Sequence, residues 1–236
     1  MSTKRLLLLS ALALSAILLA LLIMLAPGGS AARNFELPSP AQSDPPAEDG
    51  FDARAVAITA DNVREVVARI RRPDDYSREL RSEQFWDGGT AVYNFSVAVS
   101  GQKTSVVIRF GQTVKRIILR DGYVYVRYDG GYGWFSTPQL SPSDADEYQM
   151  LPTYESVTAL GREDVLSAEL RYDDAGRASV FVRAADGALG YVTEYTISAE
   201  YGLVTLAETY DGDTLVFRVS AGECDTERPD GALFEI

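Results

Sequence analysis

The alternation of apolar and polar residues through residues 103–136 constrains the fold more than any other feature of the chain. Val106, Ile108 and Phe110 share one face of a strand, and the residues between them share the other. A period of two with glycine-containing turns is typical of antiparallel hairpins. Asp121-Gly122 is the strongest turn signal, because a two-residue type I′ loop needs positive φ at both central positions. The segment is therefore predicted to be a β-meander.

The same pattern continues on both sides of the meander. In residues 90–101, Tyr93, Phe95 and Val97 alternate with polar residues, which predicts a sheet with one buried and one wet face. Further strands are expected near 77–86, 167–173, 177–184, 190–198, 203–210 and 214–220. Together these give about ten strands, joined as sequential hairpins without βαβ alternation. The predicted fold class is α+β, with one strongly curved antiparallel sheet that forms a half-barrel.

An amphipathic helix is expected to cover the apolar face of this sheet. It is predicted over residues 59–72, from Thr59 as N-cap to the residue before Pro73. One apolar stripe at i, i+3, i+4 and i+7 is formed by Val63, Val66, Val67 and Ile70. A helical insertion at 141–166 is predicted to add two short helices, the first opening at Ser141-Pro142 and the second ending at Gly161.

The N-terminal part of the chain predicts a membrane anchor. Residues 6–26 are apolar and uncharged; this run exceeds a usual signal-peptide core and matches the roughly 20 residues of a membrane span. An uncleaved single-pass anchor within 1–32 is therefore favoured, and cleavage near Ala32, giving a secreted or periplasmic protein, is the alternative. Lys4 and Arg5 keep the N-terminus cytoplasmic, so the domain is expected on the extracytoplasmic side.

Residues 33–57 separate this segment from the folded domain. They are rich in proline and poor in large apolar residues, which predicts a disordered linker. Residues 58–236 then form one domain, long enough to fold without a metal or a disulfide.

Composition excludes several classes of function. The chain has no histidine and a single cysteine, Cys224, which removes the commonest general base and any Ser-His or Cys-His pair. No cofactor or metal site is expected, because the acidic run Asp144-Ala145-Asp146-Glu147 lacks calcium-loop spacing. The net charge is −12 and no basic patch is evident, so nucleic acid is not an expected partner.

Three passages resemble a known family. They are DGYVYVRYDG at 121–130, EYTISAEYGLVTLAETYDGDTLVFR at 194–218 and PDGALFEI at 229–236. They are similar to the outer-membrane lipoprotein-sorting (LolA/LolB-like) superfamily, which includes the RseB-type sensors of envelope stress. Tyr201-Gly202-Leu203 stands at a turn that recurs there and Phe234 at the closing position, whereas Ser198 replaces the usual acidic residue. The resemblance implies a curved sheet around an apolar cavity that holds acyl chains or senses mislocalised lipoproteins.

The hypothesis that follows is a non-enzymatic domain, tethered to the membrane through residues 6–26, that binds a hydrophobic ligand or a lipoprotein. The ligand is expected on an apolar face shared by Val67, Ile70, Phe95, Phe110 and Tyr125. One alternative is an envelope sensor or interaction module with a filled core. A second is a hydrolase of envelope polymers, for which no residue constellation is found.

Overall fold

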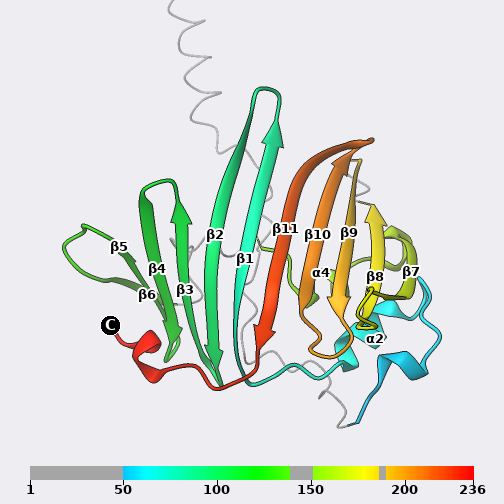
Figure 1. Cartoon of the computed structure of the whole chain (residues 1–236), viewed down its shortest axis with the longest axis horizontal. Helices are drawn as coiled ribbons and strands as arrows, with labels where there is room; N and C mark the ends of the chain where they lie inside the picture. The colour runs from blue at the N-terminus through cyan, green and yellow to red at the C-terminus, as the bar shows by residue number, and fades with distance from the viewer. Residues whose placement is uncertain (1–49, 139–150, 186–189) are drawn as a thin grey trace, which may run out of the picture. The chain divides into compact units, whose positions relative to one another are not determined.

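The computed structural model describes residues 50–138, 151–185 and 190–236. The predicted single antiparallel sheet is confirmed, with eleven strands in the order β6-β5-β4-β3-β2-β1-β11-β10-β9-β8-β7 (Figure 1). The strands are β1 (Asp75–Trp86), β2 (Gly89–Ser100), β3 (Lys103–Phe110), β4 (Thr113–Arg120), β5 (Tyr123–Tyr128), β6 (Phe135–Pro138), β7 (Val165–Tyr172), β8 (Ala178–Ala185), β9 (Tyr191–Ser198), β10 (Val204–Asp211) and β11 (Thr214–Asp225).

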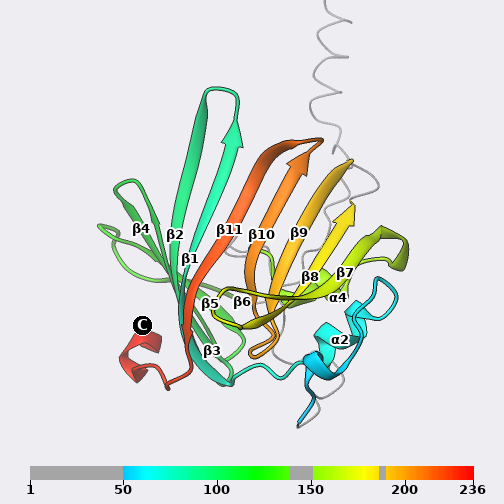
Figure 2. The ribbon, with the colours of Figure 1, turned by 45° about the vertical axis from the view of Figure 1, so that its right-hand side comes forward.

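β1 and β11 join the two halves of the sheet. Strands β1–β6 follow one another on one side and β7–β11 on the other, so the first and last strands pair at the centre. Figure 2 shows the strong curvature of the sheet, which confirms the half-barrel. A register shift between Arg78 and Leu80 in the β1–β11 pair contributes, because a bulge bends a strand and increases its twist.

The Asp121-Gly122 turn has the conformation that its sequence predicts. Asp121 has a φ of 53° and Gly122 a φ of 76°, the two positive values that a type I′ loop requires. The turn sets the register of β4 and β5, in which Arg120 lies opposite Tyr123.

The helix is shorter than predicted, because α2 spans only Val63–Arg69. The side chain of Asn62 accepts a hydrogen bond from the Thr59 N–H (2.9 Å) and donates one to the Ala57 carbonyl (2.8 Å). These bonds hold the preceding residues in a turn, so Asn62 is the N-cap and Thr59 is not. At the other end Ile70 is already extended, with a ψ of 124°.

The apolar stripe of this helix is nevertheless buried as predicted, at Val63, Val66, Val67 and Ile70. Its arginines bind the neighbouring helix: Arg64 donates a hydrogen bond to the Leu160 carbonyl (2.9 Å), and the Arg72 guanidinium lies 3.5 Å from the centre of the Tyr154 ring. These two contacts fasten α2 and the residues after it to the insertion.

Within the insertion, the described part holds α4 (Tyr154–Thr158) and the 3-10 turn η2 (Arg162–Asp164). Gly161 does not cap α4, whose C-cap is Ala159; it precedes η2, and its N–H donates to the Asp164 carboxylate (3.2 Å). The helix predicted to open at Ser141-Pro142 lies outside the described residues, as does the acidic run at 144–147.

One face of the sheet, here called the inner face, carries two buried clusters. The first joins α2 and α4 to β8–β10 and includes Val66, Val67, Ile70, Val157, Val180, Val182, Ile197, Val204 and Ala207. The second lies along β1–β5 and includes Leu80, Phe95, Val97, Val106, Ile108, Ile117, Leu119, Val124 and Val126, with Leu151 from the insertion.

The opposite, outer face is covered locally by the C-terminus. The 3-10 turn η3 (Gly231–Phe234) lies against β3, and Phe234 is buried. Arg120 at the end of β4 donates a hydrogen bond to the Phe234 carbonyl (2.9 Å). This contact gives the closing phenylalanine a structural role.

The packed chain includes residues ahead of the predicted boundary at 58. Ala53, in the 3-10 turn η1 (Ala53–Ala55), is fully buried in the first cluster, and Phe51 packs against that cluster. None of the helices within the described residues is long and apolar enough to cross a membrane. The predicted anchor at 6–26 lies outside them.

Candidate functional site

The five residues predicted to form one ligand face lie in three different places. Val67 and Ile70 belong to the first cluster and Phe95 to the second. Phe110 continues the inner face of β3 but is 45% exposed. Tyr125 lies on the outer face, because the β4–β5 register pairs it with Ile118 whereas Ile117 pairs with Val126. The prediction that all five share a face is therefore wrong, because a period of two places adjacent strand residues on opposite faces.

Phe110 belongs to an aromatic rim at one end of the inner face of β1–β6. Its ring stacks on that of Tyr93, with centroids 4.4 Å apart and an interplanar angle of 15°. Trp86, Tyr128 and Phe135 bring further exposed rings to this end of the inner face. Below the rim lie buried Phe95 and Ile108, which are paired across β2 and β3. The rim is thus continuous with the apolar floor of the second cluster.

Lys115 is buried at the edge of this floor. It lies opposite Ile108 on β3 and Tyr128 on β5. Its ammonium is 5.5 Å from the centre of the Tyr128 ring, within the range of a cation–π interaction. Lys115 is thus held within the fold, and the rim itself consists of apolar rings, which suit an apolar ligand.

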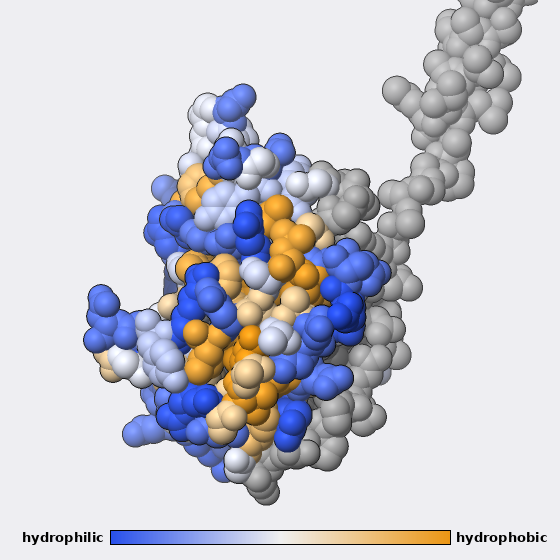
Figure 3. All heavy atoms as spheres, turned by 90° about the vertical axis from the view of Figure 1, so that its right-hand side faces the viewer, coloured by the Kyte–Doolittle hydropathy of each residue, from blue (hydrophilic) through white to orange (hydrophobic). Residues whose placement is uncertain are grey.

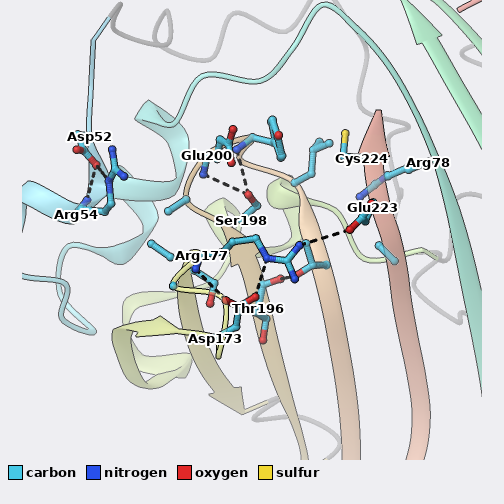
Figure 4. Close-up of a pocket in the computed structure, with 18 of the residues that line it drawn as sticks. Asp52, Arg54, Arg78, Asp173, Arg177, Thr196, Ser198, Glu200, Glu223 and Cys224 are labelled. Carbon is cyan, nitrogen blue, oxygen red and sulfur yellow. Dashed lines mark hydrogen bonds and ion pairs between the residues drawn. The ribbon is translucent and has the colours of Figure 1, made fainter. Parts of the chain in front are cut away.

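A separate groove, with a volume of about 1110 Å³, opens around the ends of β8–β11 beside residues 50–54 (Figure 4). Its charged lining residues are Asp52, Arg54, Arg78, Asp173, Arg177, Glu200 and Glu223. None of the five predicted ligand residues lines it. Asp52 pairs with Arg54, and Asp173 and Glu223 pair with Arg177. The groove therefore presents polar surface of both signs and differs from an apolar cavity.

Arg177 organises one wall of this groove (Figure 4). Its Nε donates to the Asp173 carboxylate (2.8 Å), and its Nη1 lies 3.9 Å from the Glu223 carboxylate. Hydrogen bonds lower the pKa of Asp173, first from the Arg177 backbone N–H and then from its side chain. The pKa of Asp52 is lowered chiefly by the side-chain hydrogen bond from Arg54. Both carboxylates are therefore acceptors fixed in place, with pKa values far below those of a general base at neutral pH.

Ser198 shapes the back of the groove. Its hydroxyl accepts hydrogen bonds from the backbone N–H groups of Glu200 and Tyr201, both at 3.2 Å. Ser198 therefore holds the backbone of the turn that follows β9.

Cys224 lines the groove beside Arg78. Burial raises the pKa of its thiol above the ordinary value, while the charge of Arg78 acts weakly in the opposite direction. The residue is therefore a neutral thiol at neutral pH, which disfavours a nucleophilic role. Across the three described ranges, no group of three or more acidic or cysteine side chains is placed to hold a metal.

Pattern reasoning missed the Tyr93–Phe110 stack and the contribution of residues 50–54 to the groove. The stack joins two strands, so the pattern within a single strand does not predict it. In their own strands Tyr93 and Phe110 both occupy positions that face inward. Residues 50–54 follow a proline-rich stretch and were therefore assigned to the predicted linker, although Phe51 and Ala53 pack in the first cluster.

A second apolar surface lies along the free edge strand β7. Figure 3 looks onto this side and shows apolar residues gathered in a band among charged ones. On β7 itself Leu166 is 51% exposed and Tyr172 is also exposed. Among the described strands β7 pairs with β8 alone, and an edge strand of this kind presents backbone groups with which another strand could pair.

No family model matches the chain, and no curated protein matches it. Similar solved structures include the Pseudomonas aeruginosa MucA/MucB complex, with a TM-score of 0.47 and 14% identity over 75% of this chain and 60% of that one. A LolA-superfamily protein from Nitrosomonas europaea has a TM-score of 0.35 and 12% identity over 76% of this chain and 99% of that one. A DUF1329-family protein from Desulfovibrio piger has a TM-score of 0.36 and 12% identity over 75% of this chain and 95% of that one.

All three structures match with TM-scores below 0.5, so the half-barrel is described from this chain's own strands. The chain spans about three fifths of the length of the MucB-complex chain that it matches. At these identities the likeness carries no information about a ligand or partner.

Proposed function

We propose that this chain is a non-enzymatic binding domain, held at the cell membrane on its extracytoplasmic side by residues 6–26. Its ligand is an apolar chain, either an acyl chain or the lipidated end of a lipoprotein, accepted at the aromatic rim of β1–β6. The single observation that supports this is the exposed Phe110, stacked on Tyr93 and continuous with the buried floor at Phe95 and Ile108. Val67, Ile70 and Tyr125 are not part of this proposed surface.

A bound chain would cover the rim and extend the second cluster. Exposed large apolar side chains that adjoin a core are stabilised when a ligand removes them from water, by about 25 cal/mol for each Å² of apolar surface buried. The exposed rings therefore account for the binding of an apolar chain.

The sensor or interaction module with a filled core remains the second candidate. The observation in its favour is the tight packing of the first cluster, in which Val67 is 0% and Ile70 2% exposed. A carrier that used this half of the sheet would need an apolar cavity of some hundreds of Å³ beside these residues. The groove at the ends of β8–β11, with its mixed charges, is better suited to a polypeptide than to an acyl chain.

Photolabelling of the full chain with a diazirine fatty acid tests the proposal. Labelled peptides should come from β2–β5, and Phe110→Glu should reduce this labelling about 30-fold, because an introduced charge removes roughly 2 kcal/mol of apolar contact. Leu166→Glu is the matched control, because Leu166 is similarly exposed but lies on β7. Labelling confined to residues 6–26, or unchanged by Phe110→Glu, would reject the ligand surface and favour the interaction module.

A further inference from the structure

The outer face of β3–β5 carries a cluster of arginines that the sequence does not reveal. The β-sheet register places Arg116 directly opposite Arg127, and it places Arg109 diagonally beside Arg116, because Val107 is the residue opposite Arg116. Residues 103–138 hold six Lys or Arg but two Asp or Glu residues, a balance of +4 in a chain whose net charge is −12. The expectation that the chain has no basic patch is therefore wrong, because the strand register gathers residues that are dispersed in sequence.

These arginines are only partly neutralised by their neighbours. Arg116 lies 3.3 Å from the Asp129 carboxylate, and it is the member of the three that forms an ion pair with a described residue. Arg109 donates instead to the hydroxyl of Ser96 (2.9 Å), which in turn donates to the Glu79 carboxylate (3.0 Å), so its nearest acidic group is one hydrogen bond removed. The Arg127 guanidinium lies 4.9 Å from the centre of the Trp134 ring. Like charges directly opposite one another destabilise a strand pair, so the cluster is a cost to the fold that an external anion would relieve.

Aromatic side chains of the β5–β6 loop adjoin the cluster. Trp134 lies beneath Arg127, and Tyr132 is fully exposed at the tip of the loop. Gly131 and Gly133 flank Tyr132, and Gly130 and Gly133 have positive φ values of 86° and 152°, so the loop backbone is free of the restraints that side chains impose. Tryptophan and tyrosine beside arginine is the combination that prefers the headgroup layer of a bilayer, where the ring is half buried and the cation meets phosphate.

We propose that this basic-aromatic surface, formed by Arg109, Arg116, Arg127, Tyr132 and Trp134, docks the domain onto a bilayer surface that carries anionic lipids. Charge complementarity supports a lipid surface over a nucleic acid. A long nucleic acid bound at the cluster would also lie against other parts of this strongly acidic chain, and their negative charge would repel it. A bilayer would contact only the region around the cluster. The surface lies on the face opposite the proposed ligand rim, and the inference does not rest on the proposed ligand.

The two tryptophans of the chain, Trp86 and Trp134, allow a direct test. Trp86→Phe leaves Trp134 as the sole reporter in the full chain, reconstituted into vesicles of brominated phosphatidylcholine with or without phosphatidylglycerol. Residues 6–26 contain no tryptophan, so anchoring by itself does not quench the emission. We expect quenching of Trp134 in the anionic vesicles, its reversal by salt, and little quenching in vesicles of phosphatidylcholine alone.

Two triple variants distinguish the effect of the charge at the cluster from the effect of the net charge of the chain. Arg109→Gln with Arg116→Gln and Arg127→Gln should abolish the difference between the two kinds of vesicle. Arg171→Gln with Arg177→Gln and Arg183→Gln, on β7, β8 and the turn between them, removes the same net charge and should preserve that difference. If the triple variant fails to fold, the reversal of Trp134 quenching by salt in the protein that retains all three arginines still tests the proposal.

Three outcomes would overturn the proposal. One is the absence of quenching although the chain floats with the vesicles. Another is quenching that is equal in neutral and anionic vesicles and insensitive to salt. The third is a change in Trp134 emission produced by single-stranded DNA or an acidic peptide but not by anionic lipid, which would assign the surface to that partner.

Discussion

At the scale of single residues, Gly202 decides how closely the β9–β10 turn approaches α2. It has a φ of +64°, and a Cβ there would lie 3.2 Å from the Ile70 carbonyl oxygen and 3.1 Å from Cγ of Arg72. Its N–H donates to the Ser198 carbonyl, and the Ser198 N–H donates to the Leu203 carbonyl, both at 2.9 Å. The Tyr201-Gly202-Leu203 motif is therefore a packing element that joins the sheet to the end of the helix.

Gly202→Ala should accordingly destabilise the domain by about 2–5 kcal/mol, because the left-handed backbone and the steric contact with Ile70 both oppose a side chain. Gly212→Ala is the control: Gly212 has a φ of +58° and open space around it, so only the backbone cost of about 1–2 kcal/mol applies. Chemical denaturation measures both. Equal losses would show that the contact with Ile70 is unimportant.

Cys224 supplies a pH-dependent prediction. Since burial raises the pKa of its thiol, alkylation by iodoacetamide at neutral pH should be slower than that of a free thiol and should rise only above the ordinary cysteine pKa. A raised pKa in the folded state also means that the contribution to stability is present below the unfolded-state pKa and is lost as the pH rises through the folded-state pKa. Fast alkylation at neutral pH in the native chain would contradict the assignment.

At the scale of elements, α2 shows what a pattern specifies and what it leaves open. The buried stripe followed from the spacing of Val63, Val66, Val67 and Ile70, because burial depends on the helical period. The start of the helix did not follow, because Thr59 and Asn62 are both good caps and only the contacts of Asn62 with Ala57 and Thr59 decide between them.

Asn62→Ala should therefore cost about 1–3 kcal/mol, because it removes the two side-chain hydrogen bonds to Thr59 and Ala57, each worth about 0.5–1.5 kcal/mol. Thr59→Ala should cost less, because the Thr59 backbone N–H and carbonyl, rather than its side chain, make the turn. Thermal denaturation of the two variants measures the difference. A larger loss of stability in Thr59→Ala than in Asn62→Ala would indicate that Thr59 is the N-cap, as the sequence predicted.

In the sheet, too, some features depend on local sequence and others depend on how the strands pair. The alternation in residues 103–136 and the Asp121-Gly122 turn were enough to predict the meander, because both are local. The opposition of Arg116 and Arg127, the Tyr93–Phe110 stack and the outward direction of Tyr125 all depend on the strand register. Most of the sheet was therefore predictable, whereas the candidate surfaces, which are assembled across strands, were largely not.

At the scale of the whole domain, the β1–β11 pair connects two cores that are otherwise separate. The first cluster lies with α2 and α4 over β8–β10, and the second lies over β1–β5. β1 pairs with β2 along its whole length and with β11 on its other side. Loss of the central strands would separate the two halves, so opening there requires global unfolding, whereas β6 and β7 can open locally.

Hydrogen exchange tests this gradient directly. Amides of β1, β2 and β11 should exchange last, at rates set by global unfolding, and those of β6 and β7 should exchange fastest among the strands, because each edge strand has a single neighbour. The prediction is for dilute protein, since β7 offers an open backbone edge beside exposed Leu166. If β7 were as protected as β1, the edge would be paired in solution. Protection that rises with protein concentration would identify the pairing strand as one from a second copy, and protection that does not would require cover from within the same chain.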